Sequence, residues 1–402
     1  MSARKRFEYI DRCRGVGSAR AAGRVHTMAR STDQHIEFLD PVRGIAILMV
    51  FLIHSLGTGF GHDQLPWGTW FRDFGGARSF LCLLPLTFGW AGVAVFFVVS
   101  GFCIHLSFSR QPSWSQFLQK RFYRIYPPYL LALLVFAFVF PVTRFRPRLS
   151  EPAQFATHLG LVHNLDWRWF YGINSSFWSI AVEVQLYALY PLLVFLTKRL
   201  GWGRTLAGIA VIEVVLRLAD GILLTVSDSG LLKYASGSPF MFWFSWSIGA
   251  FIAERHIRKM PIVTPGYWVC AVGIAAIGSA WIKPVSSMSF LFFALLTGGV
   301  ISRLLWKPVR VLPIPGVVWK HLQQVGVWSF SLYLFHQPLL WAMPGVVFKL
   351  TSGATVHPLV LFSLCLMTWA FMVPLARMTY QWVELPSVRL GKLIHGRGAS
   401  AT

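Results

Sequence analysis

Charged residues are scarce in this sequence, where they make up 13% of 402 residues. A soluble globular domain carries about 25% charged residues. Hydrophobic residues account for 55% of the chain and aromatic residues for 16%, and the mean hydropathy is +0.56. This composition argues against a soluble fold. It predicts a polytopic protein embedded in a lipid bilayer, with aromatic belts at both interfaces.

Acidic residues are scarcer than basic ones: 15 Asp and Glu stand against 37 Lys and Arg, for a net charge of +22. In a soluble protein this charge would suggest nucleic-acid binding. Here the basic residues instead flank apolar segments, so we expect no nucleic-acid partner. The segments that we interpret as membrane spans lie near residues 42–60, 86–108, 125–143, 177–197, 205–227, 238–254, 263–282, 286–302, 325–348 and 356–376.

The basic residues also predict the orientation of these segments. With the N-terminus inside, the cytoplasmic stretches hold 27 Lys and Arg and the external loops hold nine. The positive-inside rule therefore predicts an all-α protein of about ten transmembrane helices, N-in and C-in. The external loop 144–176 fits least, because it contains Arg144, Arg146, Arg148 and Arg168. These arginines are solvated, or they bind an anionic glycan, or the number of spans differs.

Cysteine is rare as well, and the five cysteines follow no metal-binding or redox spacing. Without a C-x-x-C pair we expect neither a disulfide framework nor a metal site. The sequence also lacks a nucleophile elbow and the residue order of a Ser-His-Asp triad. The chemistry of a serine hydrolase is therefore not expected.

The N-terminal segment, residues 1–36, lacks the apolar region of a signal peptide and is rich in Arg, Ala and Gly. We expect a disordered basic cytoplasmic tail; translation starting at Met28 is an alternative. Residues 37–392 are expected to form the membrane domain, and residues 393–402 a second cytoplasmic tail. We find no additional soluble domain.

The first apolar segment begins with Asp40-Pro41, which predicts a helix that has Asp40 as its N-cap. Arg43 lies in the opening turn and His54 lies eleven residues later. At 100° per residue both share one helix face, roughly 16 Å apart along the axis. Ionisable groups in a membrane are costly and usually functional. We therefore predict that Arg43 binds an anion and that His54 is a general base; alternatively, they serve membrane orientation and helix packing.

Arg121 and Arg124 lie three residues apart on the cytoplasmic side, so they share a helix face, with Tyr126 nearby. Guanidinium groups bind phosphate in bidentate fashion, and an aromatic ring can stack on a base. This pattern predicts a site for a cofactor with phosphates and an adenine, with a solvated basic surface as the alternative. Pro127 and Pro128 are expected to break this helix and to redirect the chain.

A polar stripe runs along the fourth apolar segment and consists of Ser176, Ser179, Glu183 and Tyr187. A carboxylate in a membrane span costs about 2–3 kcal/mol, so Glu183 needs a partner. Arg43 or a tyrosine is a structural partner; alternatively, Glu183 polarises His54 or binds a sugar hydroxyl. Small residues of the second segment, Ser100 and Gly101 among them, allow a ligand or a backbone to approach closely.

Six motifs in order resemble the acyltransferase-3 family of bacterial integral membrane proteins, over residues 36–392. The opening signature, with its Arg and His separated by ten residues, is followed by elements similar to FFxxSGF, RxxRIxP, WSLSVExQxY, SLYLxHxP and a closing E-x-P. They lie at residues 39–54, 96–102, 120–127, 178–187, 331–338 and 384–386. Two positions depart from the pattern, since Ala94 and Val184 stand where many members have acidic residues. The acceptor preference can therefore differ from that of the common members.

The resemblance implies transfer of an acyl group, most often acetyl, from cytoplasmic acyl-CoA to a carbohydrate hydroxyl of a surface or exported glycan. It implies a location in the bacterial inner membrane, with acyl-CoA as a substrate and no permanently bound cofactor. We expect direct attack on the thioester, with an acyl-histidine relay as the alternative. The residues that we assign are His54, Glu183 and Arg43 to catalysis, Arg121, Arg124, Tyr126, Ser100 and Gly101 to acyl-CoA, and Trp178, Ser179, Tyr187 and His336 to the acceptor.

Two other functions fit the same sequence. A protein of ten spans with intramembrane ionisable residues could be a transporter or flippase of acylated glycan intermediates, although the broken spans typical of transporters are not evident. Acylation of a small molecule is the other. His336 is more simply a packing residue than a ligand contact. The sequence predicts no oligomeric state.

Overall fold

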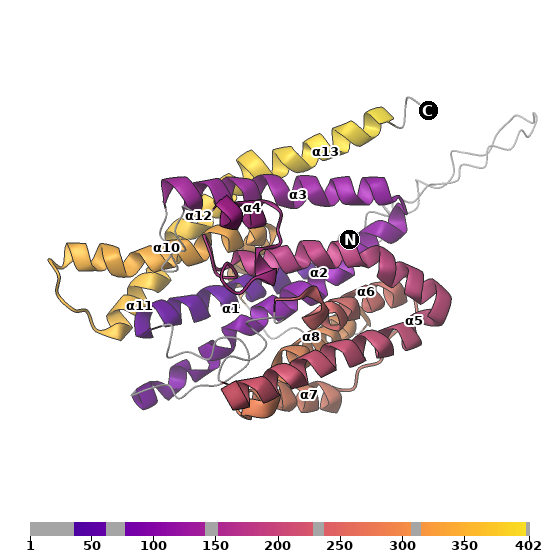
Figure 1. The fold of residues 1–402 in the computed structure, drawn as a ribbon, viewed down its shortest axis with the longest axis horizontal. Coiled ribbons are helices and arrows are strands. Elements are labelled where there is room, and N and C mark those ends of the chain that lie inside the picture. Colours follow the sequence, from indigo (N-terminus) through magenta and orange to yellow (C-terminus); the bar gives the residue numbers. More distant parts are fainter. Residues whose placement is uncertain (1–35, 62–76, 141–151, 228–236, 307–314, 399–402) are drawn as a thin grey trace, which may run out of the picture. The chain divides into compact units, whose positions relative to one another are not determined.

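The computed structural model describes residues 36–61, 77–140, 152–227, 237–306 and 315–398. Within these residues the regular structure is entirely helical (Figure 1), which confirms the expected all-α class. Residues Glu37–Thr402 form one compact unit. The expected N-terminal tail, Met28 and the arginines between 144 and 148 lie outside the described residues, apart from Ile36.

The helices in chain order are α1 (Leu39–Phe60), η2 (Ala77–Trp90), α2 (Ala91–Arg110), α3 (Trp114–Leu134), η3 (Val135–Val139), α4 (Pro152–Leu159), η4 (His163–Leu165), α5 (Phe177–Ser227), η6 (Pro239–Met241), α6 (Trp243–Ile257), α7 (Gly266–Ala280), η7 (Lys283–Val285), α8 (Met288–Trp306), α9 (Gly316–Val327), α10 (Ser329–Leu350), α11 (Pro358–Met367), α12 (Trp369–Thr379), η8 (Tyr380–Glu384) and α13 (Leu385–Gly398).

Five helical stretches of the described part are long and apolar enough to cross a membrane. They are Leu39–Phe60, Leu83–Arg110, Trp114–Val139, Met288–Trp306 and Pro358–Ile394. An all-α chain with several such stretches is a multi-pass membrane protein. The total of about ten spans and the N-in, C-in orientation stay predictions.

Helix α1 begins two residues earlier than expected, at Leu39, and its N-cap position is Phe38, which makes no side-chain cap. The expectation that Asp40 caps the helix is therefore wrong. Asp40 lies within the first turn, where its negative charge is favourable near the positive end of the helix dipole. One oxygen of its carboxylate lies 3.7 Å from a guanidinium nitrogen of Arg43, so it also helps to orient that side chain.

Helix α3 continues through Pro127 and Pro128, and the expected break at these prolines is wrong. Pro127 has no N–H group and cannot bond the carbonyl of Tyr123 four residues earlier. The hydroxyl of Ser387, from α13, donates a hydrogen bond to that carbonyl instead. Because the unpaired backbone group finds a partner on a neighbouring helix, α3 stays helical and presents both of its arginines on one face.

Helix α5 turns back on itself at Gly201 (Figure 1). Gly201 has φ 77° and ψ 163°, a conformation that side-chain-bearing residues avoid. This bend separates the two apolar segments that the sequence indicates near 177–197 and 205–227. Only the first of them, which begins at Phe177, contributes to the cavity described below.

Helices α2 and α6 approach closely through glycines. A Cβ atom at Gly101 would lie 2.0 Å from the carbonyl oxygen of Trp246, and one at Gly249 would lie 1.9 Å from that of Val98. Glycine is therefore required at both positions. The close contact directs the opposite side of α2, with Ser100 and Cys103, toward the cavity.

Candidate functional site

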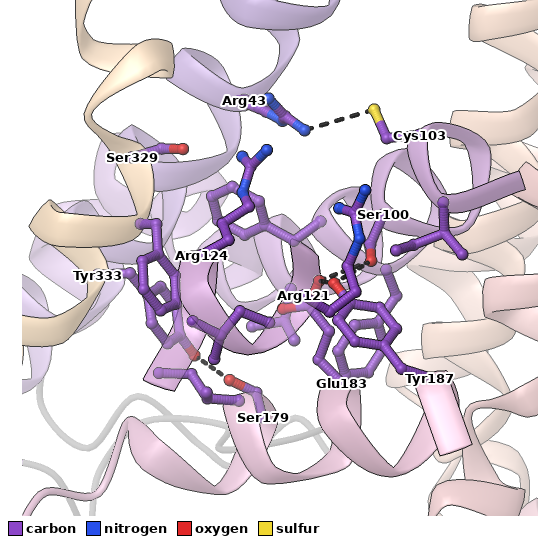
Figure 2. A pocket seen from close by; sticks show the side chains of 17 residues that line it. Arg43, Ser100, Cys103, Arg121, Arg124, Ser179, Glu183, Tyr187, Ser329 and Tyr333 are labelled. Atoms are coloured by element: carbon purple, nitrogen blue, oxygen red, sulfur yellow. Dashed lines mark hydrogen bonds between the residues drawn. The ribbon is translucent and has the colours of Figure 1, made fainter. Parts of the chain in front are cut away.

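Five helices, α1, α2, α3, α5 and α10, surround a cavity (Figure 2). Arg43, Arg121 and Arg124 contribute to its lining from α1 and α3. The figure shows their guanidinium groups gathered at one end, near the thiol of Cys103. Three positive charges in a partly buried space form an anion-binding site, and their planar donors suit phosphate.

The arginines keep donors available at this end of the cavity. Arg43 contacts the sulfur of Cys103 at 3.4 Å, and one terminal nitrogen of Arg121 donates to Ser107 at 3.1 Å. The buried Nε of Arg121 has no hydrogen-bond partner among the residues that the structure describes. Since a buried N–H group without an acceptor is unfavourable, this nitrogen indicates a site for an anionic oxygen.

The middle of the cavity contains a polar cluster around Glu183. The Ser100 hydroxyl donates to Oε1 of Glu183 at 2.6 Å, and the Tyr187 hydroxyl donates to the same oxygen. The hydroxyls of Ser100 and Tyr187 lie 3.1 Å apart, and the indole N–H of Trp246 donates to Ser100 at 3.3 Å. Of the two structural partners expected for Glu183, Arg43 or a tyrosine, the structure shows a tyrosine, Tyr187. The cluster holds two hydroxyl groups in fixed orientations at the cavity wall.

Tyr333 and Ser179 close the other end of the cavity, where their hydroxyl oxygens lie 2.6 Å apart (Figure 2). Ser179 also donates to the carbonyl of Ser176 at 3.2 Å. The ring of Tyr333 makes an edge contact with Phe96, with ring centroids 5.9 Å apart. Tyr333 is a residue of the cavity that the sequence analysis did not assign. Its only signal was its position three residues before His336 in the motif 331–338.

His54 and His336 lie beyond Tyr333. Their rings are 5.1 Å apart between centroids, and the ring of His336 lies 5.2 Å from that of Tyr333. His336 is fully buried, and its Nδ1 lies 2.8 Å from the carbonyl oxygen of Tyr333. Among the described residues, neither imidazole contributes to the lining of the cavity. Arg43 thus lines the cavity, whereas His54 contacts His336, which in turn lies beside Tyr333 in the cavity wall.

Three other assigned residues lie around the cavity and make structural contacts. The Tyr126 hydroxyl donates to the carbonyl of Leu159 at 3.2 Å, and Gly101 faces α6 rather than the cavity. Trp178 stacks on Phe170, with centroids 5.5 Å apart. Their roles in binding stay predictions. Cys103, to which the sequence assigned no role, also lines the cavity.

Comparisons with known proteins find relatives over most of the chain. The family model of the acyltransferase domain, acyltransferase-3, matches residues 36–377. Nodulation protein 10 of Rhizobium leguminosarum bv. viciae is 23% identical over 75% of this chain and 83% of its own length. Acyltransferase MdmB of Streptomyces mycarofaciens is 28% identical over 74% of this chain and 77% of its own.

Peptidoglycan O-acetyltransferase OatA of Listeria monocytogenes is 23% identical over 63% of this chain and 46% of its own length. No solved structure matches the chain. The match to the family model extends from the start of α1 into α12 and includes every helix that surrounds the cavity. The chain therefore belongs to the acyltransferase-3 family and is a multi-pass membrane enzyme that transfers acyl groups.

Proposed function

We propose that this enzyme transfers an acetyl group from cytoplasmic acetyl-CoA to a hydroxyl of a surface or exported glycan, in the bacterial inner membrane. The observation that carries the proposal is the set of groups gathered in and beside one cavity. Three arginines and several hydroxyl groups line it, and two imidazoles lie next to Tyr333 of its wall. The name of OatA, a peptidoglycan O-acetyltransferase, supports a glycan acceptor and an acetyl group.

The donor end follows from charge. The phosphates of coenzyme A would bind Arg43, Arg121 and Arg124, and the pantetheine arm would extend into the cavity toward Ser100 and Tyr187. These two hydroxyls are oriented by Glu183. They are suited to donate to the thioester carbonyl oxygen as negative charge develops on it. In this role Glu183 is a positioning residue.

The chemical step is a direct attack. His54 accepts the proton of the acceptor hydroxyl while the oxygen forms a bond to the thioester carbon. The C–S bond then breaks, and the thiolate of coenzyme A takes the proton from the imidazolium. The reaction is balanced, and no other reactant is needed.

The test is acetyl transfer by the full-length protein in lipid nanodiscs. Radiolabelled acetyl-CoA is offered together with glycans extracted from cells that lack the gene. We expect label in the glycan fraction with the wild type. We expect a loss of about 10²–10⁴-fold in rate with His54→Ala, because general-base catalysis contributes that much.

The matched control is His357→Asn, since the exposed His357 caps α11, which does not line the cavity, and Asn preserves a cap. It should retain the wild-type rate. Full activity of a folded His54→Ala protein would contradict the assigned base. Absence of labelled glycan with the wild type would contradict the proposed function as a whole.

A further inference from the structure

A second polar cluster lies beside the two imidazoles, where the start of α5 meets the middle of α10. The amide of Asn174 donates to the carbonyl of Leu334 at 2.8 Å, and the Ser176 hydroxyl donates to the side-chain oxygen of Gln337 at 2.5 Å. These bonds fix the segment 174–176 against α10 around His336. The members of this cluster, which we name the imidazole cluster, are Asn174, Ser175, Ser176, His336 and Gln337, and all are at least nine-tenths buried.

Two polar atoms of the imidazole cluster have no hydrogen-bond partner among the described residues. They are Nε2 of His336 and the hydroxyl oxygen of Ser175, on side chains that are 0% and 4% exposed. A buried polar atom without a partner costs about 1–3 kcal/mol. Each of these two atoms therefore calls for a partner that the described residues do not supply, such as a bound guest.

The chemistry of the guest follows from the tautomer of His336. A carbonyl oxygen only accepts, so Nδ1, at 2.8 Å from the carbonyl of Tyr333, carries the ring proton. Nε2 is then a bare acceptor, which needs a donor such as an O–H group. The Ser175 hydroxyl can donate or accept. The imidazole cluster contains no Asp, Glu, Lys or Arg, in contrast to the arginine end of the cavity.

We propose that the imidazole cluster is the acceptor subsite, where a neutral sugar hydroxyl donates to Nε2 of His336 and a neighbouring sugar oxygen contacts Ser175. The reacting hydroxyl of the same sugar, a different one, then lies beside His54, whose ring is 5.1 Å from that of His336. Tyr333, whose ring lies 5.2 Å from that of His336, also lines the donor cavity, so the two substrates would meet beside it. This assignment rests on the proposed function and gives it an acceptor class, an uncharged polyhydroxyl ring.

The experiment uses two substitutions of His336 that distinguish the roles of its two ring nitrogens, Nδ1 and Nε2. The amide nitrogen of Asn in His336→Asn can replace Nδ1 and keep the bond to Tyr333, but nothing replaces Nε2. In His336→Gln the longer side chain places an acceptor near the position of Nε2. Ser175→Ala removes the other unpartnered atom. The Ser175 hydroxyl oxygen makes no hydrogen bond to a described residue, so its removal breaks no such bond within the protein.

The assay is the nanodisc transfer reaction. The concentration of the extracted, unacetylated glycans is varied at saturating acetyl-CoA, and the concentration of acetyl-CoA is varied at saturating glycan. We expect His336→Asn to raise the KM for glycan about tenfold, the effect of one lost hydrogen bond, with the KM for acetyl-CoA unchanged. Ser175→Ala should raise the glycan KM in the same sense, and His336→Gln should lie close to the wild type.

An unchanged glycan KM in both His336→Asn and Ser175→Ala would overturn the subsite and indicate that buried water alone satisfies these atoms. A parallel rise of both KM values together with a lower Tm would overturn it as well, since a structural defect does not distinguish the substrates. In either case wild-type transfer leaves the proposed function intact. A wild type without any transfer overturns both proposals together.

Discussion

The proposed phosphate-binding role of Arg121 leads to a prediction at the scale of single residues. Its Nε is buried and has no hydrogen-bond partner among the described residues. An anion bound there would use the planar N–H donors of the guanidinium group and not only its charge. We expect Arg121→Lys to raise the KM for acetyl-CoA about tenfold, as for one lost charge-assisted bond. Acetyl-pantetheine carries no phosphate and should show the same KM with either enzyme.

The matched control is Arg258→Lys, because Arg258 is exposed and pairs with Glu254 one turn earlier in the chain. Exposed pairs of this kind contribute about 0–1 kcal/mol, and its kinetics should be those of the wild type. A weaker reaction of Arg121→Lys with both thioesters alike would show that Arg121 supports the fold and does not bind phosphate.

The sequence permits assignment of residues that are close along one helix. Arg43 and His54 on α1, and Arg121 and Arg124 on α3, share faces that the helical repeat alone predicts. The position of Tyr333 in the cavity wall, beside His336, was not predictable in this way. It depends on the pairing of α10 with α5, and nothing in the composition of either helix determines that contact.

At the scale of helices, α3 shows how a long-range contact overrides a local rule. Local chemistry predicts a break at Pro127, but the carbonyl that it leaves without a donor is bonded by Ser387, 264 residues away from Tyr123 in the chain. In contrast, the reversal of α5 at Gly201 needs only the positive φ that glycine adopts readily. A local break such as the one at Gly201 can be recognised in a sequence, whereas a long-range compensation such as the Ser387 hydrogen bond cannot.

This compensation predicts a specific mutant cycle. Ser387→Ala leaves the Tyr123 carbonyl unpaired, which should destabilise the protein by about 1–3 kcal/mol. In the double variant Pro127→Ala, Ser387→Ala, the restored N–H bonds the same carbonyl within α3. The Tm of the purified protein in detergent should therefore fall in the single variant and largely recover in the double variant.

Ser363→Ala serves as the control, because the exposed Ser363 hydroxyl only bonds a carbonyl of its own helix at Leu359. Its Tm should be close to that of the wild type. A lower Tm of the double variant than of Ser387→Ala would contradict this prediction. It would show that Ser387→Ala does not destabilise the protein through the unpaired Tyr123 carbonyl.

At the scale of the whole molecule, the proposed chemistry depends on which membrane face the arginine end of the cavity occupies. Arg43 lies in the first turn of α1, and Ser329 begins α10 and also lines the cavity. The starts of these helices therefore share the arginine end. The proposed donor, acyl-CoA, is cytoplasmic, so the proposal requires this end to face the cytoplasm, in agreement with the positive-inside prediction.

Reporter fusions test this orientation independently of activity. A fluorescent protein that folds only in the cytoplasm, fused after Thr402, should fluoresce. An alkaline phosphatase that is active only outside should be active when inserted at Ser352, between α10 and α11, and inactive at Lys259, between α6 and α7. Phosphatase activity at Lys259 with none at Ser352 would invert the topology. The three arginines would then face away from every source of acyl-CoA, and the donor site would have to be abandoned even though the family assignment would stand.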